Sequence, residues 1–207
     1  MLFRSNTATA HSLCKLQKLF HIPIIGVIAP GVAAAVAQSK NQHIGVIGTK
    51  GTIQSGIYQK ALQEKAPTAQ IIAAACPLFT PLVEEQYCES PFAKAIIAEH
   101  LRVFKSHCID TLLLGCTHYP LLKHLIAEEI GPGVAIVDSA STCAENVASL
   151  LNNYPSNYSA FECSNIPLCS LQKVSFFVSD DPERFRNIGE KFLEMPIPKV
   201  FKVSIPS

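Results

Sequence analysis

The sequence predicts an α/β protein built on a parallel β-sheet with helices on both faces. Of its 207 residues, 48% are apolar and only 16% are charged, so the chain has enough apolar side chain to bury a core. Short apolar runs alternate with segments of helical spacing, which is the pattern of βα units whose strands pair in parallel. Cysteine or polar residues follow several of these runs, where sites of α/β proteins lie.

The first half of the chain contains the clearest units. Leu13, Leu16 and Leu19 follow helical spacing, and glycines separate the next strand from its helix. A later helix ends before Pro67. The expected elements are a helix at 8–20, a strand at 24–28, a helix at 31–38, a strand at 43–47, a turn at 48–52, a helix at 53–65 and a strand at 70–75.

The second half repeats the pattern and then changes character. Residues 152–168 are rich in Asn, Ser, Pro and Tyr and predict a long loop. Asp180, Asp181 and Glu183 surround Pro182, which predicts a capped helix N-terminus. The expected elements are a helix at 90–105, a strand at 109–114, a loop at 116–119, a helix at 120–129, a strand at 134–137, a strand at 174–178 and a helix at 182–193.

Composition excludes several classes of partner. The formal net charge is +1 with no basic run, which argues against nucleic acid. Residues 22–37 are uncharged, but Pro23, Gly26, Pro30 and Gly31 interrupt them, so we expect a strand, a turn and a helix and no membrane span. The eight cysteines include no CxxC pair, and we expect reduced thiols in a cytoplasmic protein.

Cofactor and metal motifs are absent. The stretch 45–52 follows a strand and opens a helix, but it matches neither GxGxxG nor the P-loop, so a plain βα turn with Thr52 as N-cap is expected. Cys116 and His118 are only two residues apart and there is no HExxH, which argues against zinc. No cofactor is implied.

Cys116 is the strongest candidate for chemistry. It follows an apolar strand and precedes a helix, with Thr117 and His118 beside it, a setting that lowers the pKa of a thiol. The alternative is a core cysteine with a capping threonine. Glu84 and Glu85 end a second strand-end segment, and such a pair is either a solvated helix start or an acid that contacts the substrate.

Seven segments resemble the glutamate racemases of the aspartate/glutamate racemase superfamily, in that family's order. They are Ser5-Asn-Thr-Ala8, Pro23-Ile-Ile-Gly-Val-Ile28, Ile44-Gly-Val-Ile-Gly-Thr49, Ala75-Cys-Pro-Leu-Phe79 with Pro81-Leu-Val-Glu-Glu85, Leu114-Gly-Cys-Thr-His-Tyr-Pro120, Asp138-Ser-Ala140 and Ser179-Asp-Asp-Pro-Glu-Arg-Phe185.

The resemblance implies two doubly wound parallel-sheet domains related by a pseudo-two-fold axis, with glutamate between them. Two thiols, one on each side of the α-carbon, would exchange its proton without metal or cofactor, supplying D-glutamate for peptidoglycan. By this resemblance Cys116, His118 and Glu85 (or Glu84) are catalytic or support catalysis. Asn6, Thr7, Thr117 and His118 are the substrate-binding residues. A homodimer is left open.

This chain departs from the family in two ways. Ser5 occupies the position of the second catalytic cysteine, and a hydroxyl is a much poorer base than a thiol. About seventy residues that precede this point in the family, enough for the first strands and helices of a domain, have no counterpart here. A start codon placed too late, or a partial gene product, would account for this.

We therefore expect residues 1–29 and 139–207 to be the remnant of the first α/β domain and residues 30–138 to be the second. Glutamate racemisation is the expected function, impaired in this chain. Two alternatives remain open: a non-catalytic amino-acid-binding remnant, and a fragment that needs a separate N-terminal piece.

Overall fold

The computed structural model describes residues 1–152 and 174–204. Its contacts divide the chain into two compact units, residues 1–153 and 154–207, which are considered separately below. This division differs from the two domains expected from the sequence, residues 1–29 with 139–207 and residues 30–138. The expected domain division stays a prediction. The expected loop at 152–168 falls almost entirely outside the described residues.

The first unit contains a four-stranded sheet in the order β4-β3-β5-β6, and every pairing in it is parallel. The expected α/β class with a parallel sheet is therefore confirmed. Each strand lies within two residues of the expected range. The strands are β3 (His43–Gly48), β4 (Gln70–Ala75), β5 (Thr111–Gly115) and β6 (Ala135–Asp138).

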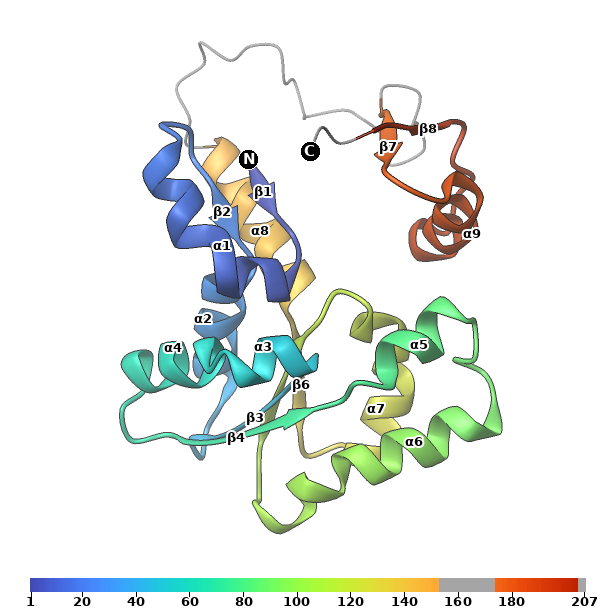
Figure 1. The fold of residues 1–207 in the computed structure, drawn as a ribbon. Coiled ribbons are helices and arrows are strands. Elements are labelled where there is room, and N and C mark those ends of the chain that lie inside the picture. Colours follow the sequence, from blue (N-terminus) through green and yellow to red (C-terminus); the bar gives the residue numbers. More distant parts are fainter. Residues whose placement is uncertain (153–173, 205–207) are drawn as a thin grey trace. The chain divides into compact units, whose positions relative to one another are not determined.

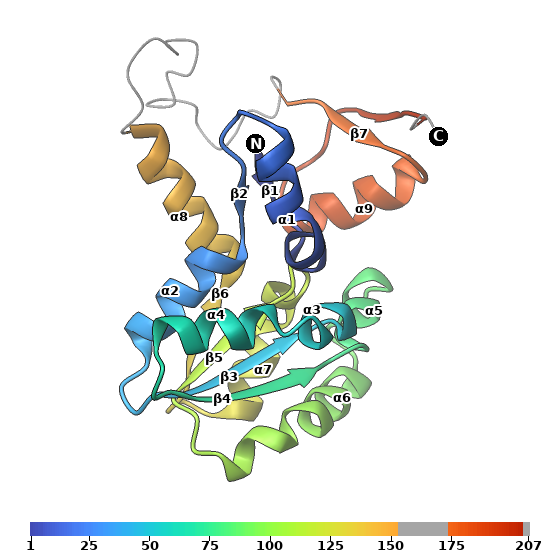
Figure 2. The ribbon, with the colours of Figure 1, turned by 60° about the vertical axis from the view of Figure 1, so that its left-hand side comes forward.

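Helices cover both faces of this sheet, and Figures 1 and 2 show α4 and α6 on opposite sides of it. Alternate residues of a strand point to opposite faces. Ile44 and Val46 accordingly belong to one core cluster, and Ile47 belongs to the other. The first cluster includes residues of α2 (Ile28–Gln38), α4 (Ile57–Lys65) and α8 (Ser139–Asn152); the second includes residues of α6 (Pro91–Leu101) and α7 (Lys123–Ile130).

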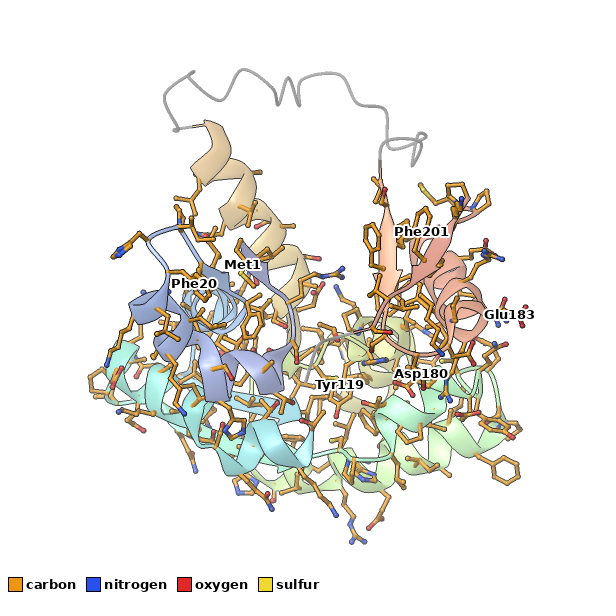
Figure 3. The ribbon with its side chains drawn as sticks, turned by 45° about the horizontal axis from the view of Figure 1, so that its top comes forward. Met1, Phe20, Tyr119, Asp180, Glu183 and Phe201 are labelled. Atoms are coloured by element: carbon orange, nitrogen blue, oxygen red, sulfur yellow. The ribbon has the colours of Figure 1, made fainter. Side chains whose placement is uncertain are left out.

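The N-terminal residues form a small β-α-β unit. Strand β1 (Leu2–Phe3) pairs in parallel with β2 (Ile25–Gly26), and α1 (Asn6–Leu19) connects them. Strand β1 has only two residues, although strands commonly have five or six. The terminal ammonium donates to the Pro23 carbonyl at 2.7 Å. Met1 and Phe20 both lie in this unit (Figure 3).

Several helix boundaries differ from expectation. The helix expected at 53–65 is two helices, α3 (Lys50–Gln54) and α4, because Gly56 adopts a positive φ of 67° between them. Thr49, and not Thr52, is the N-cap, and its hydroxyl accepts from the Thr52 N–H at 3.3 Å. The helix expected at 90–105 ends in the 3₁₀ turn η1 (Arg102–Ser106), and the helix expected at 120–129 begins with the 3₁₀ turn η2 (Tyr119–Leu122). Three elements were not predicted: α5 (Phe79–Glu84), α8 and β8.

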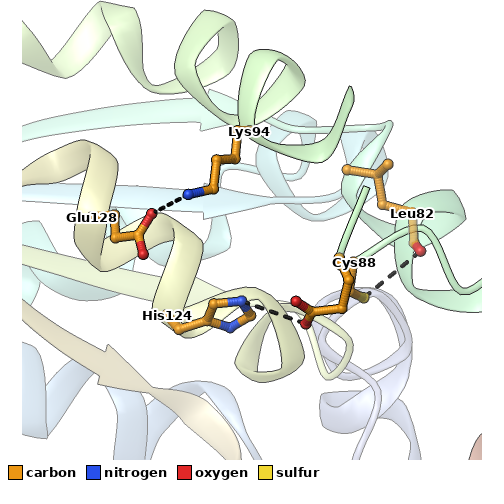
Figure 4. Close-up of polar contacts among 6 residues, drawn as sticks. Leu82, Cys88, Lys94, His124 and Glu128 are labelled. Carbon is orange, nitrogen blue, oxygen red and sulfur yellow. Dashed lines mark hydrogen bonds and ion pairs between the residues drawn. The ribbon is translucent and has the colours of Figure 1, made fainter. Parts of the chain in front are cut away.

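Polar contacts link the chain around α6 and α7 at the surface (Figure 4). Lys94 of α6 pairs with Glu128 of α7 at 2.9 Å, and the His124 Nε2 atom lies 3.8 Å from Glu89 Oε1. These side chains are largely exposed, so the pairs contribute little stability. Across the described ranges, no helix has the length and apolar content that crossing a bilayer requires.

The described part of the second unit is a β-α-β segment. Strand β7 (Phe176–Val178) pairs in parallel with β8 (Val200–Lys202), and α9 (Pro182–Leu193) connects them. The predicted cap is confirmed: the Asp181 carboxylate accepts from the Glu183 and Arg184 N–H groups, each at 3.0 Å. Phe177 and Phe201 stack with centroids 5.3 Å apart, which couples the two strands.

Candidate functional site

The carboxyl ends of the four parallel strands gather polar groups at one edge of the sheet. Thr49 follows β3, Cys76 follows β4, Cys116 follows β5, and Ser139 follows β6. Cys76 is fully buried, and burial raises the pKa of its thiol to about 12. Cys116 is also buried, but side chains that can exchange protons lie near its sulfur.

Two side chains contact the Cys116 sulfur. The Thr80 Oγ1 atom and the His118 Nδ1 atom each lie 3.8 Å from Sγ. On its other side, His118 presents Nε2 to Glu84 Oε1 at 3.2 Å. Thr80 and Glu84 are four residues apart on α5, and this spacing places both on the same helix face, beside the end of β5. The result is a relay from Glu84 through His118 to Cys116.

The expected lowering of the Cys116 pKa is wrong. Burial raises the pKa of this thiol above its ordinary value, since a thiolate is poorly solvated there. The backbone N–H groups of His118 and Tyr119 and the Thr80 hydroxyl act in the opposite direction, but they do not outweigh burial. The sequence showed the donors and could not show how deeply the thiol lies.

Of the two glutamates, the structure brings Glu84 to the site. Glu85 is exposed and is the C-cap residue of α5. The sequence could not choose between neighbours, because α5 was not predicted. Adjacent residues at a helix end point in different directions, and Glu84 is the one that pairs with His118.

Asn6 lies in a buried polar cluster at the start of α1. Its side chain is 3% exposed, its Oδ1 accepts from the Tyr58 hydroxyl at 2.5 Å, and its Nδ2 donates to Ser139 Oγ at 3.4 Å. Thr7 completes a triangle of hydroxyls, with its Oγ1 2.9 Å from that of Thr49 and 3.0 Å from that of Thr52.

Tyr58 connects this cluster with the thiol. Its ring packs so closely on Gly115, the residue before Cys116, that a Cβ there would lie 2.9 Å from the ring atom Cε2. Tyr58 therefore contacts both Asn6 and the residue before Cys116. Thr117 is half-buried and lines a pocket of about 450 Å³ beside the same strand end.

Ser5 is exposed and is the N-cap of α1. Its hydroxyl accepts from the Ala8 N–H at 3.2 Å. A hydroxyl in this role stabilises the helix start. No group of three or more potential ligands (His, Cys, Asp or Glu) is placed to hold a metal ion within residues 1–152 and 174–204.

Sequence reasoning missed several members of the site. Tyr58, Thr80 and Ser139 all contribute side chains, and each could be found only as a residue near a strand end or on the helix that follows one. Thr52 was considered only as an N-cap, and Thr49 only as the last residue of a segment that resembles the family. Their hydroxyl contacts with Thr7 depend on the packing of α1 against α3, which no local pattern reveals.

Comparison with known proteins gives a consistent result. Residues 1–147 match the model of the Asp/Glu/hydantoin racemase family. The glutamate racemase of Lactiplantibacillus plantarum is 47% identical over 73% of this chain, and the match spans 56% of that protein. The Geobacter metallireducens glutamate racemase is 40% identical over 97% of the chain and 71% of that protein.

Solved structures agree with these relatives. A glutamate racemase isoform from Bacillus anthracis superposes with a TM-score of 0.84 at 34% identity, over 99% of this chain and 74% of the other. The Francisella tularensis glutamate racemase in complex with D-glutamate gives 0.80 at 30% identity, over 97% and 71%. By its fold and by its similarity to these proteins, this chain belongs to the Asp/Glu racemase family of isomerases, among the glutamate racemases.

Proposed function

We propose that this chain binds glutamate and exchanges its α-proton through Cys116, without cofactor, as one half of a two-base racemase. The arrangement of Glu84, His118 and Cys116 carries the proposal, because it supplies a thiol, a proton acceptor and a carboxylate in sequence. The Francisella relative was solved with D-glutamate, which supports this substrate class.

The relay fits proton transfer at a buried thiol. A carboxylate only accepts hydrogen bonds, so Glu84 favours the tautomer in which His118 carries its proton on Nε2. The Nδ1 lone pair then faces the Cys116 sulfur and can take its proton. The thiolate that results is stabilised by the Thr80 hydroxyl and by backbone N–H groups, and it can remove a proton from an adjacent carbon acid.

On the opposite face of the substrate, this chain lacks a thiol that could act as the second acid or base. Racemisation needs an acid or base on each face, and the second thiol of the family corresponds to Ser5 here. A general base contributes about 10²–10⁴-fold, so we expect racemisation to be slower by at least that factor than in a complete enzyme. Exchange on the Cys116 face does not need Ser5.

The test is to incubate D- and L-glutamate separately in D₂O with the protein and to follow the α-proton by NMR and the optical activity by circular dichroism. We expect one enantiomer to lose its α-proton signal while it keeps its configuration. Cys116→Ala should abolish this exchange. Cys14→Ala removes an exposed thiol of α1 and is the matched control.

Replacing Ser5 by cysteine tests whether the missing second thiol limits racemisation. Ser5→Cys should raise the rate of racemisation relative to exchange if Ser5 is what limits the reaction. Racemisation of both enantiomers by the unaltered chain at about 1 s⁻¹ or more, an ordinary enzymatic turnover, would contradict the impairment. Absence of exchange with either enantiomer would contradict the role of Cys116.

Two alternatives have distinct outcomes in the same experiment. Glutamate binding without exchange would favour a non-catalytic amino-acid-binding remnant. Activity that requires the N-terminal part of a relative, added as a separate polypeptide, would favour a fragment that needs completion. Through its family, the D-glutamate product would serve peptidoglycan synthesis.

The domain organisation belongs to the same proposal. Residues 30–138 would be the second of two doubly wound domains, and residues 1–29 with 139–207 would be the remnant of the first. The four-stranded sheet, which spans His43–Asp138, supports the first part of this assignment.

A further inference from the structure

The proposed relay is divided between two segments of the chain that no strand pairing joins directly. Cys116 and His118 follow β5. Thr80 and Glu84 lie on α5, which follows β4. Strand β3 lies between β4 and β5, so the ends of these two strands are about 10 Å apart. The contacts of the relay therefore require that α5 be held at one distance from the loop after β5.

Tyr119 spans this distance from the side of Cys116. It begins η2, its side chain is fully buried, and its hydroxyl donates to the Cys76 carbonyl at 2.8 Å. Its backbone N–H donates to the Cys116 carbonyl at 3.3 Å, so one residue contacts the segments after β4 and after β5. Burial raises the pKa of the Tyr119 hydroxyl, which therefore stays protonated and acts as a donor.

The Cys76 carbonyl connects this hydrogen bond to α5. It also accepts from the Phe79 N–H at 3.2 Å, and Phe79 is the first residue of α5. A carbonyl oxygen has two lone pairs, so these two donors satisfy it. The position of the first turn of α5 is thereby linked to the Tyr119 hydroxyl.

The rings of Tyr119 and Phe79 add a second contact between the same segments. Their centroids are 5.2 Å apart and the rings are inclined by 65°, an edge-to-face arrangement that aromatic pairs favour. Both rings are buried in the core cluster that includes Cys76 and Cys116. Thr80 directly follows Phe79, so a shift of this turn would move the Thr80 hydroxyl away from the Cys116 sulfur.

We propose that Tyr119 is a positioning residue for the relay. Its hydrogen bond to the Cys76 carbonyl and its contact with Phe79 hold α5 at the distance where the relay residues of this helix reach their partners. The Tyr119 hydroxyl takes no part in proton transfer, because it donates to a backbone carbonyl. This inference deepens the proposed function and rests on it for the reaction that the relay serves.

Iodoacetamide labelling of Cys116, followed over pH by mass spectrometry, tests whether Tyr119 positions Thr80. With Tyr119 present, Thr80→Val should slow labelling near neutral pH by about 2-fold to 10-fold, the range for one net hydrogen bond. Tyr119→Phe keeps the ring and removes the hydroxyl. In that variant the further change Thr80→Val should have no effect, because the Thr80 hydroxyl no longer reaches the sulfur. Such non-additivity indicates that two residues are coupled.

Phe104→Leu is the control for a general loosening of the core. Phe104 is buried in the same cluster, but it lies in η1 and packs near Gly45, towards the amino end of β3. The full effect of Thr80→Val should persist in this variant. Circular dichroism checks that each variant is folded. If Tyr119→Phe does not fold, Phe79→Leu takes its place, because it removes the ring contact with Tyr119 by the same substitution as the control.

Exchange of the glutamate α-proton gives a second measurement. Tyr119→Phe should lower kcat for exchange by about 2-fold to 10-fold and leave KM unchanged, because Tyr119 is buried and acts through α5. A structural role alone would lower the stability of the chain without this separation of kcat from KM.

The outcomes separate this inference from the proposed function. An effect of Thr80→Val that is equal with and without the Tyr119 hydroxyl would overturn the positioning role. Loss of that effect in Phe104→Leu would also overturn it, since any change in the core would then suffice. Coupled labelling in a chain that exchanges no α-proton would support the positioning role and overturn the proposed function.

Discussion

At the scale of single residues, the proposed chemistry depends on whether the Cys116 sulfur is a thiol or a thiolate. Burial favours the thiol, whereas three hydrogen-bond donors favour the thiolate. Two of the donors are backbone N–H groups, which substitution cannot remove. Thr80 is the third, and its hydroxyl can be removed with little change in shape, so it is the donor whose effect can be measured.

We expect Thr80→Val to raise the pKa of Cys116 and to slow its alkylation by about 2-fold to 10-fold near neutral pH, the range for one net hydrogen bond. Thr80→Ser keeps the donor and should restore the unaltered rate. The measurement is the pH dependence of iodoacetamide labelling at Cys116, read by mass spectrometry.

The exposed thiols Cys14 and Cys108 provide internal controls, because Thr80→Val should leave their labelling unchanged. They should also react faster than Cys116, which is buried. The strand-end position of Cys116 favours the reverse order, but its burial, which the sequence does not show, slows its reaction. A pH profile of Cys116 that is identical in Thr80→Val would show that the 3.8 Å contact has no influence on the thiol.

At the scale of elements, Asp110 holds the turn between α2 and β3 against the start of β5. Burial raises the pKa of its carboxyl group, but hydrogen bonds from Ser39 Oγ, the Asn41 and Lys40 N–H groups and Thr111 Oγ1 outweigh burial and lower the pKa overall. A carboxyl group whose pKa is lower in the folded chain stabilises the fold above its unfolded pKa, and this contribution is lost as the pH falls.

Asp110→Asn should therefore lower the free energy of unfolding by about 1–3 kcal/mol at neutral pH, because the new amide would point a donor at backbone N–H groups. The difference from the unaltered chain should begin to shrink as the pH falls below about 3.9, the ordinary pKa of Asp, and it should be lost once the pH falls through the lower pKa of the folded carboxyl group. Urea unfolding at a series of pH values measures this.

Glu128→Gln is the matched control for this prediction. Its carboxylate pairs with Lys94 at the surface, and we expect a much smaller change in stability. A loss of stability in Asp110→Asn that does not vary with pH would mean that packing, and not the charge, holds the turn.

The elements themselves were largely predictable where one local pattern decided them. Strand β4 matches its expected range because its apolar residues stop before Cys76 and Pro77. Helix α9 matches because Pro182 follows a capping aspartate at its start. Helix α8 was missed because it begins directly at Ser139 after β6, without a separating loop. Helix α5 was missed because it is short and contains Pro81, although a proline is tolerated in the first turn of a helix.

The site was predictable to the extent that its residues stand in strand-end motifs. Cys116, Thr117 and His118 follow one strand and are adjacent in sequence. Tyr58 and Thr80 are brought to the same edge by helices, so their positions depend on long-range contacts that the sequence does not display.

At the scale of the whole chain, apolar side chains are unevenly covered. The central sheet has a buried cluster on each face. The N-terminal β-α-β unit, in contrast, leaves large apolar residues exposed, with Leu19 at 71%, Ile22 at 54% and Phe20 at 52%. Exposed apolar patches promote association, so we expect the isolated chain to self-associate through this region.

Limited proteolysis should then cut first before about residue 30 and leave a resistant fragment that contains residues 30–138, since local opening is easiest where few apolar side chains are buried. The fragment should extend through α8, because Cys143 and Val147 pack against the cluster that includes α2. Leu19→Glu together with Phe20→Glu should reduce self-association, measured by light scattering, and leave the same fragment, because neither side chain belongs to the central core. Resistance of the intact 207-residue chain, with no fragment of this kind, would show that the N-terminal unit is as stable as the sheet.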